Sequence, residues 1–172
     1  MSAAADRPTR RRLVAHAGAL LAGAAAPLTL AGAARAAAPS DVDAVGHLLA
    51  FERRLEAAYR GALARDAIDP ALGRRLLAHE RDHVRGLEQA LGDLGRSGPR
   101  ATAPAATVGI DFSSRRAFAA SALRLEGETV DAYTDALTGF RDDHLVQPLG
   151  SIMCCGAQHE VALRQVLGSG LL

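Results

Sequence analysis

Apolar residues recur at every third or fourth position in four stretches of the chain, which is the spacing of one face of an α-helix. The first stretch runs from about Val42 to Asp66, and the second from Pro70 to about Leu94. The third begins at Ser113 or Ser114 and extends to about Phe140, and the fourth covers roughly residues 149–167. The pattern therefore predicts four amphipathic helices.

Turn-forming residues separate these stretches. Ser40-Asp41 and Asp69-Pro70 are typical of helix starts, and Gly168 begins a glycine-rich stop. The short first connection makes the first two helices antiparallel neighbours. Residues 95–113 are rich in Gly and Pro and predict a long linker, with a short extended piece at 107–112. The expected fold is all-α: an antiparallel four-helix bundle whose two hairpins are joined by a long crossover between the second and third helices.

Acidic and imidazole side chains interrupt the apolar faces. Glu80 and His83 lie on the stripe of the second helix, Glu52 lies on or beside that of the first, and Glu126 lies on that of the third. Burying such groups is costly unless something pairs with them. Glu80-x-x-His83 also places its two side chains one turn apart on one face, where they can hold one metal ion.

The two halves of the chain repeat one another. Residues 51–63 align with 125–137 at an offset of 74, and the second helix aligns with the fourth at an offset of 76. The matching pairs include Glu52 with Glu126, Tyr59 with Tyr133, and His83 with His159. Any two alanine-rich helices align to some extent, but His and Tyr are rare here, so their coincidence favours a genuine repeat.

With these motifs the chain resembles the ferritin-like superfamily, near the rubrerythrins and the desiccation-related ferritin-like proteins, over about residues 42–167. The resemblance implies one Glu from each of the first and third helices and a Glu-x-x-His from each of the second and fourth. By position, the metal ligands that it implies are Glu52, Glu80, His83, Glu126 and His159. Iron or manganese is the expected ion, and zinc also suits these ligands.

Gly156 departs from the family pattern, which has Glu three residues before His159. Three carboxylates and two imidazoles remain, enough to hold one ion well, whereas a second ion and a symmetric di-iron site are disfavoured. Glu160 or Cys155 are candidate substitutes for the missing ligand. The alternative is that Glu160 is solvated at the edge of the stripe and Cys155 is a small core residue.

Several neighbouring side chains have two interpretations. Tyr59 and Tyr133 either donate hydrogen bonds to carboxylates across the bundle or are core aromatics with hydroxyls at its edge. His79 flanks the stripe and is expected to be structural or solvent-facing. Cys154 and Cys155 point about 100° apart on a helix, which disfavours a mutual disulfide. The sequence leaves three roles open for these cysteines: free thiols, disulfide partners of another chain, or metal ligands.

Residues 1–36 have the organisation of an export signal. Arg10-Arg11-Arg12 precedes an apolar run at 13–34, and Ala34-Arg35-Ala36 resembles a cleavage site. The paired arginines look like those of a twin-arginine signal. We therefore expect a cleaved signal at 1–36, a mature domain at 37–172, and an extracytoplasmic location in a bacterium. The alternative is an uncleaved membrane anchor.

Charge narrows the range of partners. Residues 1–36 hold 5 of the 20 basic residues and 1 of the 19 acidic ones, so the remainder has a net charge of −3. That balance argues against a nucleic-acid surface. The sequence leaves open a homo-oligomer. A module that binds a partner helix or a membrane surface lacks support, because neither an exposed apolar stripe nor a basic face is evident.

The sequence favours an exported protein that binds a transition metal in the bundle core. Such a protein could oxidise the metal or handle oxygen or peroxide, as a metal-dependent oxidoreductase of ferroxidase or peroxidase type. The alternative is a metal-free bundle with a structural or stress-protective role, for which Gly156 is the best evidence. Polar residues that converge at the centre would favour the first hypothesis, and Glu80 and His83 paired with backbone or Arg groups would favour the second.

Overall fold

The computed structural model describes residues 40–95 and 107–168, which contain four α-helices and one short 3-10 helix. Their bounds are α1 Asp41–Leu63, α2 Pro70–Asp93, α3 Arg115–Leu137, η2 Asp143–Leu145 and α4 Val146–Leu167. No strand occurs in these two ranges, and the extended piece expected at 107–112 contains a turn at Val108-Gly109 instead. The predicted all-α four-helix bundle is confirmed. The predicted export signal lies outside the described residues.

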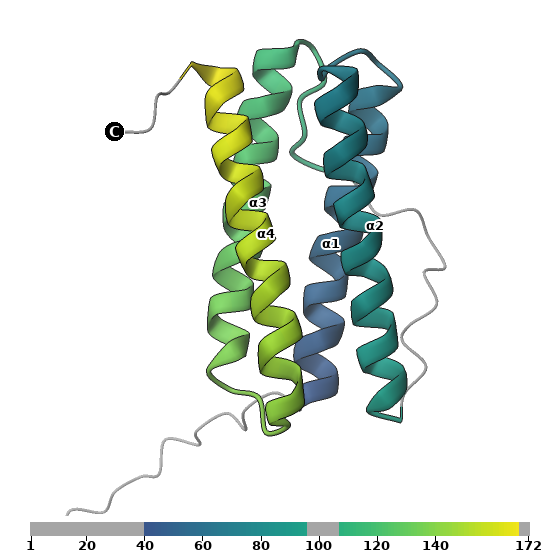
Figure 1. Ribbon diagram of the computed structural model, residues 1–172. Coiled ribbons are helices and arrows are strands. Elements are labelled where there is room, and N and C mark those ends of the chain that lie inside the picture. The colour runs from purple at the N-terminus through teal and green to yellow at the C-terminus, as the bar shows by residue number, and fades with distance from the viewer. Residues whose placement is uncertain (1–39, 96–106, 169–172) are drawn as a thin grey trace, which may run out of the picture. The chain divides into compact units, whose positions relative to one another are not determined.

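The helices pack as two hairpins (Figure 1). α1 packs along α2, α3 packs along α4, and α1 also contacts α3. Asp41, at the start of α1, accepts hydrogen bonds from the backbone N–H groups of Arg141 and Asp142, in the turn that leads from α3 to α4. This contact joins the two hairpins at one end of the bundle.

The helix starts follow the expected chemistry. The Ser40 and Ser114 hydroxyls accept hydrogen bonds from the first turns of α1 and α3, and Asp69 accepts from the N–H groups of Ala71 and Leu72. Gly168 ends α4 in the left-handed conformation, with φ of 74°. These contacts satisfy backbone groups that a helix end leaves without intrahelical partners.

Three helix bounds differ from the sequence-based expectation. α1 ends at Leu63 rather than Asp66, before a turn at residues 64–66. α4 begins at Val146 rather than Leu149, and it includes Pro148 in its first turn. Proline is tolerated there because the first N–H groups of a helix have no intrahelical acceptor. α3 ends at Leu137 rather than Phe140, before a turn that includes Gly139.

The core consists of two apolar clusters separated along the bundle. One contains Leu55, Tyr59 and Phe118, and the other contains Leu48, Leu87 and Tyr133. On each of the four helices, the residues between these clusters include buried polar groups. The fold therefore places a polar layer between two water-excluding blocks. None of the helices in the described ranges is long and apolar enough to cross a bilayer.

Candidate metal centre

Five ionisable side chains meet in the polar layer, and all four helices contribute. Their exposed fractions are Glu52 2%, Glu80 1%, His83 8%, Glu126 1% and His159 3%. The structure thus brings together the five residues that the sequence singled out. Groups of this kind are rarely buried without partners, so their contacts decide what the layer can do.

Each imidazole lies between two carboxylates. The Nδ1 atom of His83 is 3.2 Å from Glu52 Oε2 and 3.5 Å from Glu80 Oε2. The Nδ1 atom of His159 is 3.0 Å from Glu80 Oε1 and 3.2 Å from Glu126 Oε1. Glu80 is therefore the central carboxylate, and Glu52 and Glu126 are the outer ones.

The two tyrosines orient the outer carboxylates. The Tyr59 hydroxyl of α1 donates to Glu126 Oε1 of α3 at 2.5 Å. The Tyr133 hydroxyl of α3 donates to Glu52 Oε1 of α1 at 2.8 Å. Of the two interpretations left open by the sequence, cross-bundle hydrogen bonding is the one that occurs. The reciprocal pairing also shows the internal repeat in three dimensions, since each half holds the carboxylate of the other.

Glu80 differs from its neighbours because neither of its oxygens has a hydrogen-bond partner among the described residues. His83 and His159 approach it closely, but each Nδ1–H is directed to an outer carboxylate, Glu52 and Glu126 respectively. Leaving a buried acceptor without a donor costs roughly 1–3 kcal/mol, and more for a charged group. The centre of the layer is thus the place where an additional positive group would be stabilised most.

Burial raises the pKa of the Glu80 carboxyl to about 8. At Glu52, burial acts in the same direction, but hydrogen bonds from His83 and other neighbours outweigh it and lower the pKa of the carboxyl. The central carboxylate therefore retains a proton near neutral pH, whereas Glu52 is ionised.

The two imidazoles respond to the surrounding carboxylates. Burial lowers the pKa of His83, but its hydrogen bond to Glu52 and the charges of Glu52 and Glu80 outweigh that effect and raise the pKa to about 11. Burial likewise lowers the pKa of His159, but the effects of Glu126 and Glu80 outweigh it and raise that pKa to about 10. Near pH 7, Glu80, His83 and His159 therefore each hold a proton. These three protons offset the negative charge of the carboxylates in the layer.

The same atoms form two groups of three metal-ligand donors. Glu52, Glu80 and His83 make one group, and Glu80, Glu126 and His159 make the other, with the donor atoms of each group within 4.8 Å of one another. Carboxylates and imidazoles suit iron, manganese and zinc. Together with the unsatisfied oxygens of Glu80, this donor set fits a divalent ion in place of the bound protons.

Gly156 faces this layer. A Cβ atom at that position would lie 3.7 Å from Glu126 Oε2 and 3.3 Å from Val130 Cγ2. The carboxylate that the family pattern has at this position would thus point toward Glu126. Glu160 does not replace it, because its carboxylate pairs with Arg164 at 2.6 Å on the edge of the bundle. Glu160 thus lies at the stripe edge in this structure, where its side chain is paired and largely buried rather than solvated.

Cys155, which the sequence offered as a candidate ligand beside His159, also contacts His79, whose part in this group the sequence reasoning missed. Cys155 Sγ lies 3.4 Å from Nε2 of His159 and 3.6 Å from Nδ1 of His79. Cys155 therefore lies on the opposite edge of the His159 ring from Glu80 and Glu126. The signal was present in the repeat, because the offset of 76 that matches His83 with His159 also matches position 79 with position 155.

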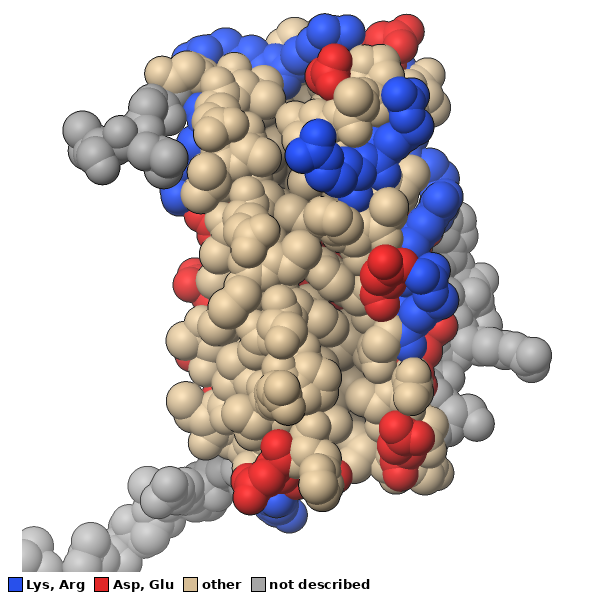
Figure 2. Space-filling view, viewed as in Figure 1, with Lys and Arg blue, Asp and Glu red and all other residues tan. Residues whose placement is uncertain are grey.

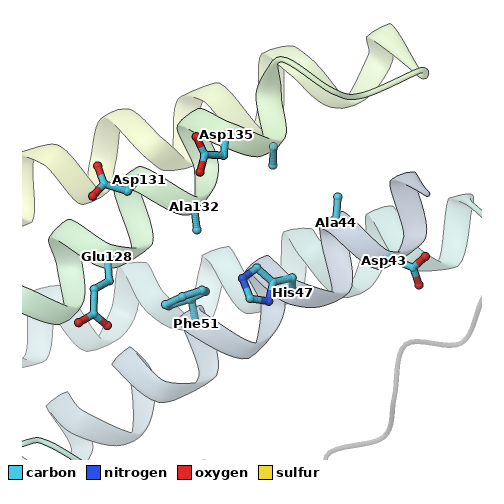
Figure 3. Close-up of a pocket in the computed structure, with 9 residues that line it drawn as sticks. Asp43, Ala44, His47, Phe51, Glu128, Asp131, Ala132 and Asp135 are labelled. Atoms are coloured by element: carbon cyan, nitrogen blue, oxygen red, sulfur yellow. The ribbon is translucent and has the colours of Figure 1, made fainter. Parts of the chain in front are cut away.

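A separate groove lies between α1 and α3 (Figure 3). His47 and Phe51 line it from α1, and Glu128, Asp131 and Asp135 line it from α3. None of the five residues of the polar layer is among its lining residues. The candidate metal centre is therefore inside the bundle and distinct from this surface groove.

Comparison with known proteins places the fold and the layer in context. The family model of the ferritin-like domain matches residues 40–169, which include all four helices and all five residues of the layer. Comparisons with curated proteins and with solved structures found no significant match. Because the family model covers most of the sequence, we conclude that the chain belongs to the ferritin-like domain family.

Proposed function

We propose that this protein binds iron or manganese in the polar layer and uses the bound ion in oxidation chemistry, either oxidation of the metal itself or reaction with oxygen or peroxide. The observation that carries the proposal is Glu80, a buried carboxylate at the centre of the layer whose two oxygens lack hydrogen-bond donors in the described part of the chain. Neither an Arg nor a backbone group there donates to Glu80, which is the outcome that favours the metal-binding hypothesis over a metal-free one.

The chain's own residues would divide the task. Glu80 belongs to both donor groups and would hold the ion between the hairpins, with His83 and His159 as nitrogen donors. Tyr59 and Tyr133 keep the outer carboxylates in position. The apolar clusters on either side limit access of water. When bound, iron or manganese supplies one-electron redox chemistry that these side chains lack.

Binding would also move protons. Nitrogen and carboxylate ligands must lose their protons before they coordinate a metal. The raised pKa values of Glu80, His83 and His159 mean that these groups are protonated at neutral pH, so the ion would replace protons rather than add charge to an already balanced layer.

A second candidate function is a structural bundle without metal. Gly156 favours it, because one expected ligand is missing. The ion pairs of His83 with Glu52 and of His159 with Glu126 also provide partners for four of the five groups without any metal. Only Glu80 has close ion-pair contacts but no aligned hydrogen bond in the described ranges, so the two candidate functions differ in the role they give to Glu80.

We further propose that residues 1–36 direct export through the twin-arginine route. We also propose that the chain is most similar to the rubrerythrin or desiccation-related branch of the family. The support for the export route is the arginine group at 10–12 and the apolar run that follows it. This route carries folded proteins, which suits a domain that acquires its ion first. Replacing Arg10 and Arg11 with Lys should retain the protein in the cytoplasm, and unchanged export in cell fractionation would contradict the proposal.

The main test is metal content of protein purified without chelator. The unchanged protein should hold about one or two iron or manganese ions per chain, and Glu80→Gln should lose them because the central anionic ligand is gone. Glu56→Gln is the matched control, since Glu56 pairs with Arg60 and Arg81 on the surface. Absence of metal from the unchanged protein even after reconstitution, or retention of metal by Glu80→Gln, would overturn the assignment.

Proton release provides a pH-dependent test. Adding Fe²⁺ or Mn²⁺ to metal-free protein at pH 7 should release protons, and the apparent affinity should rise from pH 6 to 8 as Glu80, with a pKa of about 8, loses its proton. Calorimetry in buffers with different ionisation enthalpies measures the number released. Binding that is independent of pH and buffer would show that the ion does not displace the protons of this layer.

Restoring the missing carboxylate tests the role of position 156. Gly156→Glu should raise metal content by about one ion per chain, because the family pattern has Glu at this position. Gly156→Ala adds the same Cβ, with the same contact to Val130, but no ligand, and should leave the content unchanged. Equal metal content in the two variants would show that the missing carboxylate does not limit binding.

A further inference from the structure

Three donor atoms meet on the side of His159 that faces away from the polar layer. Cys155 Sγ is 3.4 Å from His159 Nε2 and 3.6 Å from His79 Nδ1, and the two nitrogens are 3.0 Å apart. These atoms come from α2 and α4. None of them is a carboxylate oxygen, so this group differs in chemistry from the layer beside it.

The spacing of the three atoms matches the edges of a zinc coordination tetrahedron. Zn–N bonds of about 2.0–2.1 Å and Zn–S bonds of about 2.3 Å place two nitrogens about 3.3 Å apart and a nitrogen about 3.5 Å from a sulfur. Each observed separation is within about 0.3 Å of these values, so the spacing suits one ion, which would replace the direct contact between His79 Nδ1 and His159 Nε2.

His159 is already oriented for such a site. Its Nδ1–H is directed to Glu126 Oε1 at 3.2 Å, so Nε2 is the ring nitrogen that faces His79 and Cys155, and loss of the Nε2 proton would give it a lone pair there. An imidazole that binds zinc almost always donates its other N–H to a carboxylate or a carbonyl, and that partner fixes the tautomer and the ring orientation. Glu126 and His159 have this arrangement.

We propose that His79 Nδ1, Cys155 Sγ and His159 Nε2 form a second metal site, selective for zinc or a similar borderline-soft divalent ion. Two imidazoles and a thiolate favour such ions over manganese, which prefers carboxylate ligands. Binding forms one S–metal and two N–metal bonds and releases the Cys155 thiol proton and the Nε2 proton of the His159 imidazolium to solvent, with no change in oxidation state. The proposal does not depend on occupation of the polar layer. Because His159 Nδ1 keeps its proton for Glu126 here, an ion in the layer would then be held by Glu52, Glu80 and His83.

The site is accessible to solvent. His79 and Cys155 are only partly buried, whereas His159 is buried. In Figure 2, the surface over the middle of α4 is largely uncharged, while charged side chains gather over α2. Because two of the three ligand residues are partly exposed, water would be the fourth ligand.

Cobalt provides a probe with a thiolate signature that the polar layer cannot produce. Co²⁺ added to the reduced protein should give a thiolate-to-cobalt charge-transfer band at one ion per chain, and Zn²⁺ should abolish it by displacement. Cys155→Ser and His79→Gln should each eliminate or strongly weaken the band. Cys154→Ser is the matched control, because Cys154 is the exposed neighbour outside the donor group, and it should retain the full band.

The results also separate this site from the layer. Glu80→Gln should keep the cobalt band even where it loses iron or manganese, because Glu80 is not a member of the thiolate group. Absence of the band in the unchanged, reduced protein would overturn the proposal. So would a band that survives in Cys155→Ser, or one that is lost equally in Cys154→Ser.

Discussion

A buried carboxylate that receives no aligned hydrogen bond within the described residues is the constraint on which the centre of this bundle depends. Glu80 is 1% exposed and has a histidine on either side, yet both Nδ1–H groups are directed to the outer carboxylates. Such an arrangement is stable only if a proton or a cation compensates the charge. The raised pKa of Glu80, to about 8, is the metal-free form of that compensation, and a bound ion would be the other.

The apolar clusters strengthen the electrostatic effect of this buried carboxylate. They lie on both sides of the layer along all four helices, so the layer is held in a medium where electrostatic interactions are strong and water is scarce. The reciprocal hydrogen bonds of Tyr59 and Tyr133 then join α1 and α3 through the outer carboxylates. The layer thus contributes to the association of the hairpins as well as to ligand binding, which explains how such polar groups are accommodated in a core.

Periodicity and turn chemistry were sufficient to predict the bundle and the residues of its polar layer, because both depend on which face of each helix is buried. They were not sufficient for Cys155, His79 and Glu160. These residues lie at the edges of the stripes, where a rotation of the helix or the choice of rotamer decides whether a side chain turns inward. Glu160 turns to Arg164, whereas His79 turns to His159. The start of α4 was also expected at about residue 149, whereas the helix begins at Val146 and includes Pro148 in its first turn.

Anomalous diffraction from crystals of the protein loaded with Fe²⁺ or Mn²⁺ tests the central claim most directly. The account predicts an anomalous peak within coordination distance of a Glu80 oxygen, with Nδ1 of His83 or of His159 as a further ligand. A layer in which Glu80 remains protonated and no peak is present, in crystals where the ion is bound elsewhere on the chain, would contradict it and would leave a ferritin-like bundle whose polar core serves the fold alone.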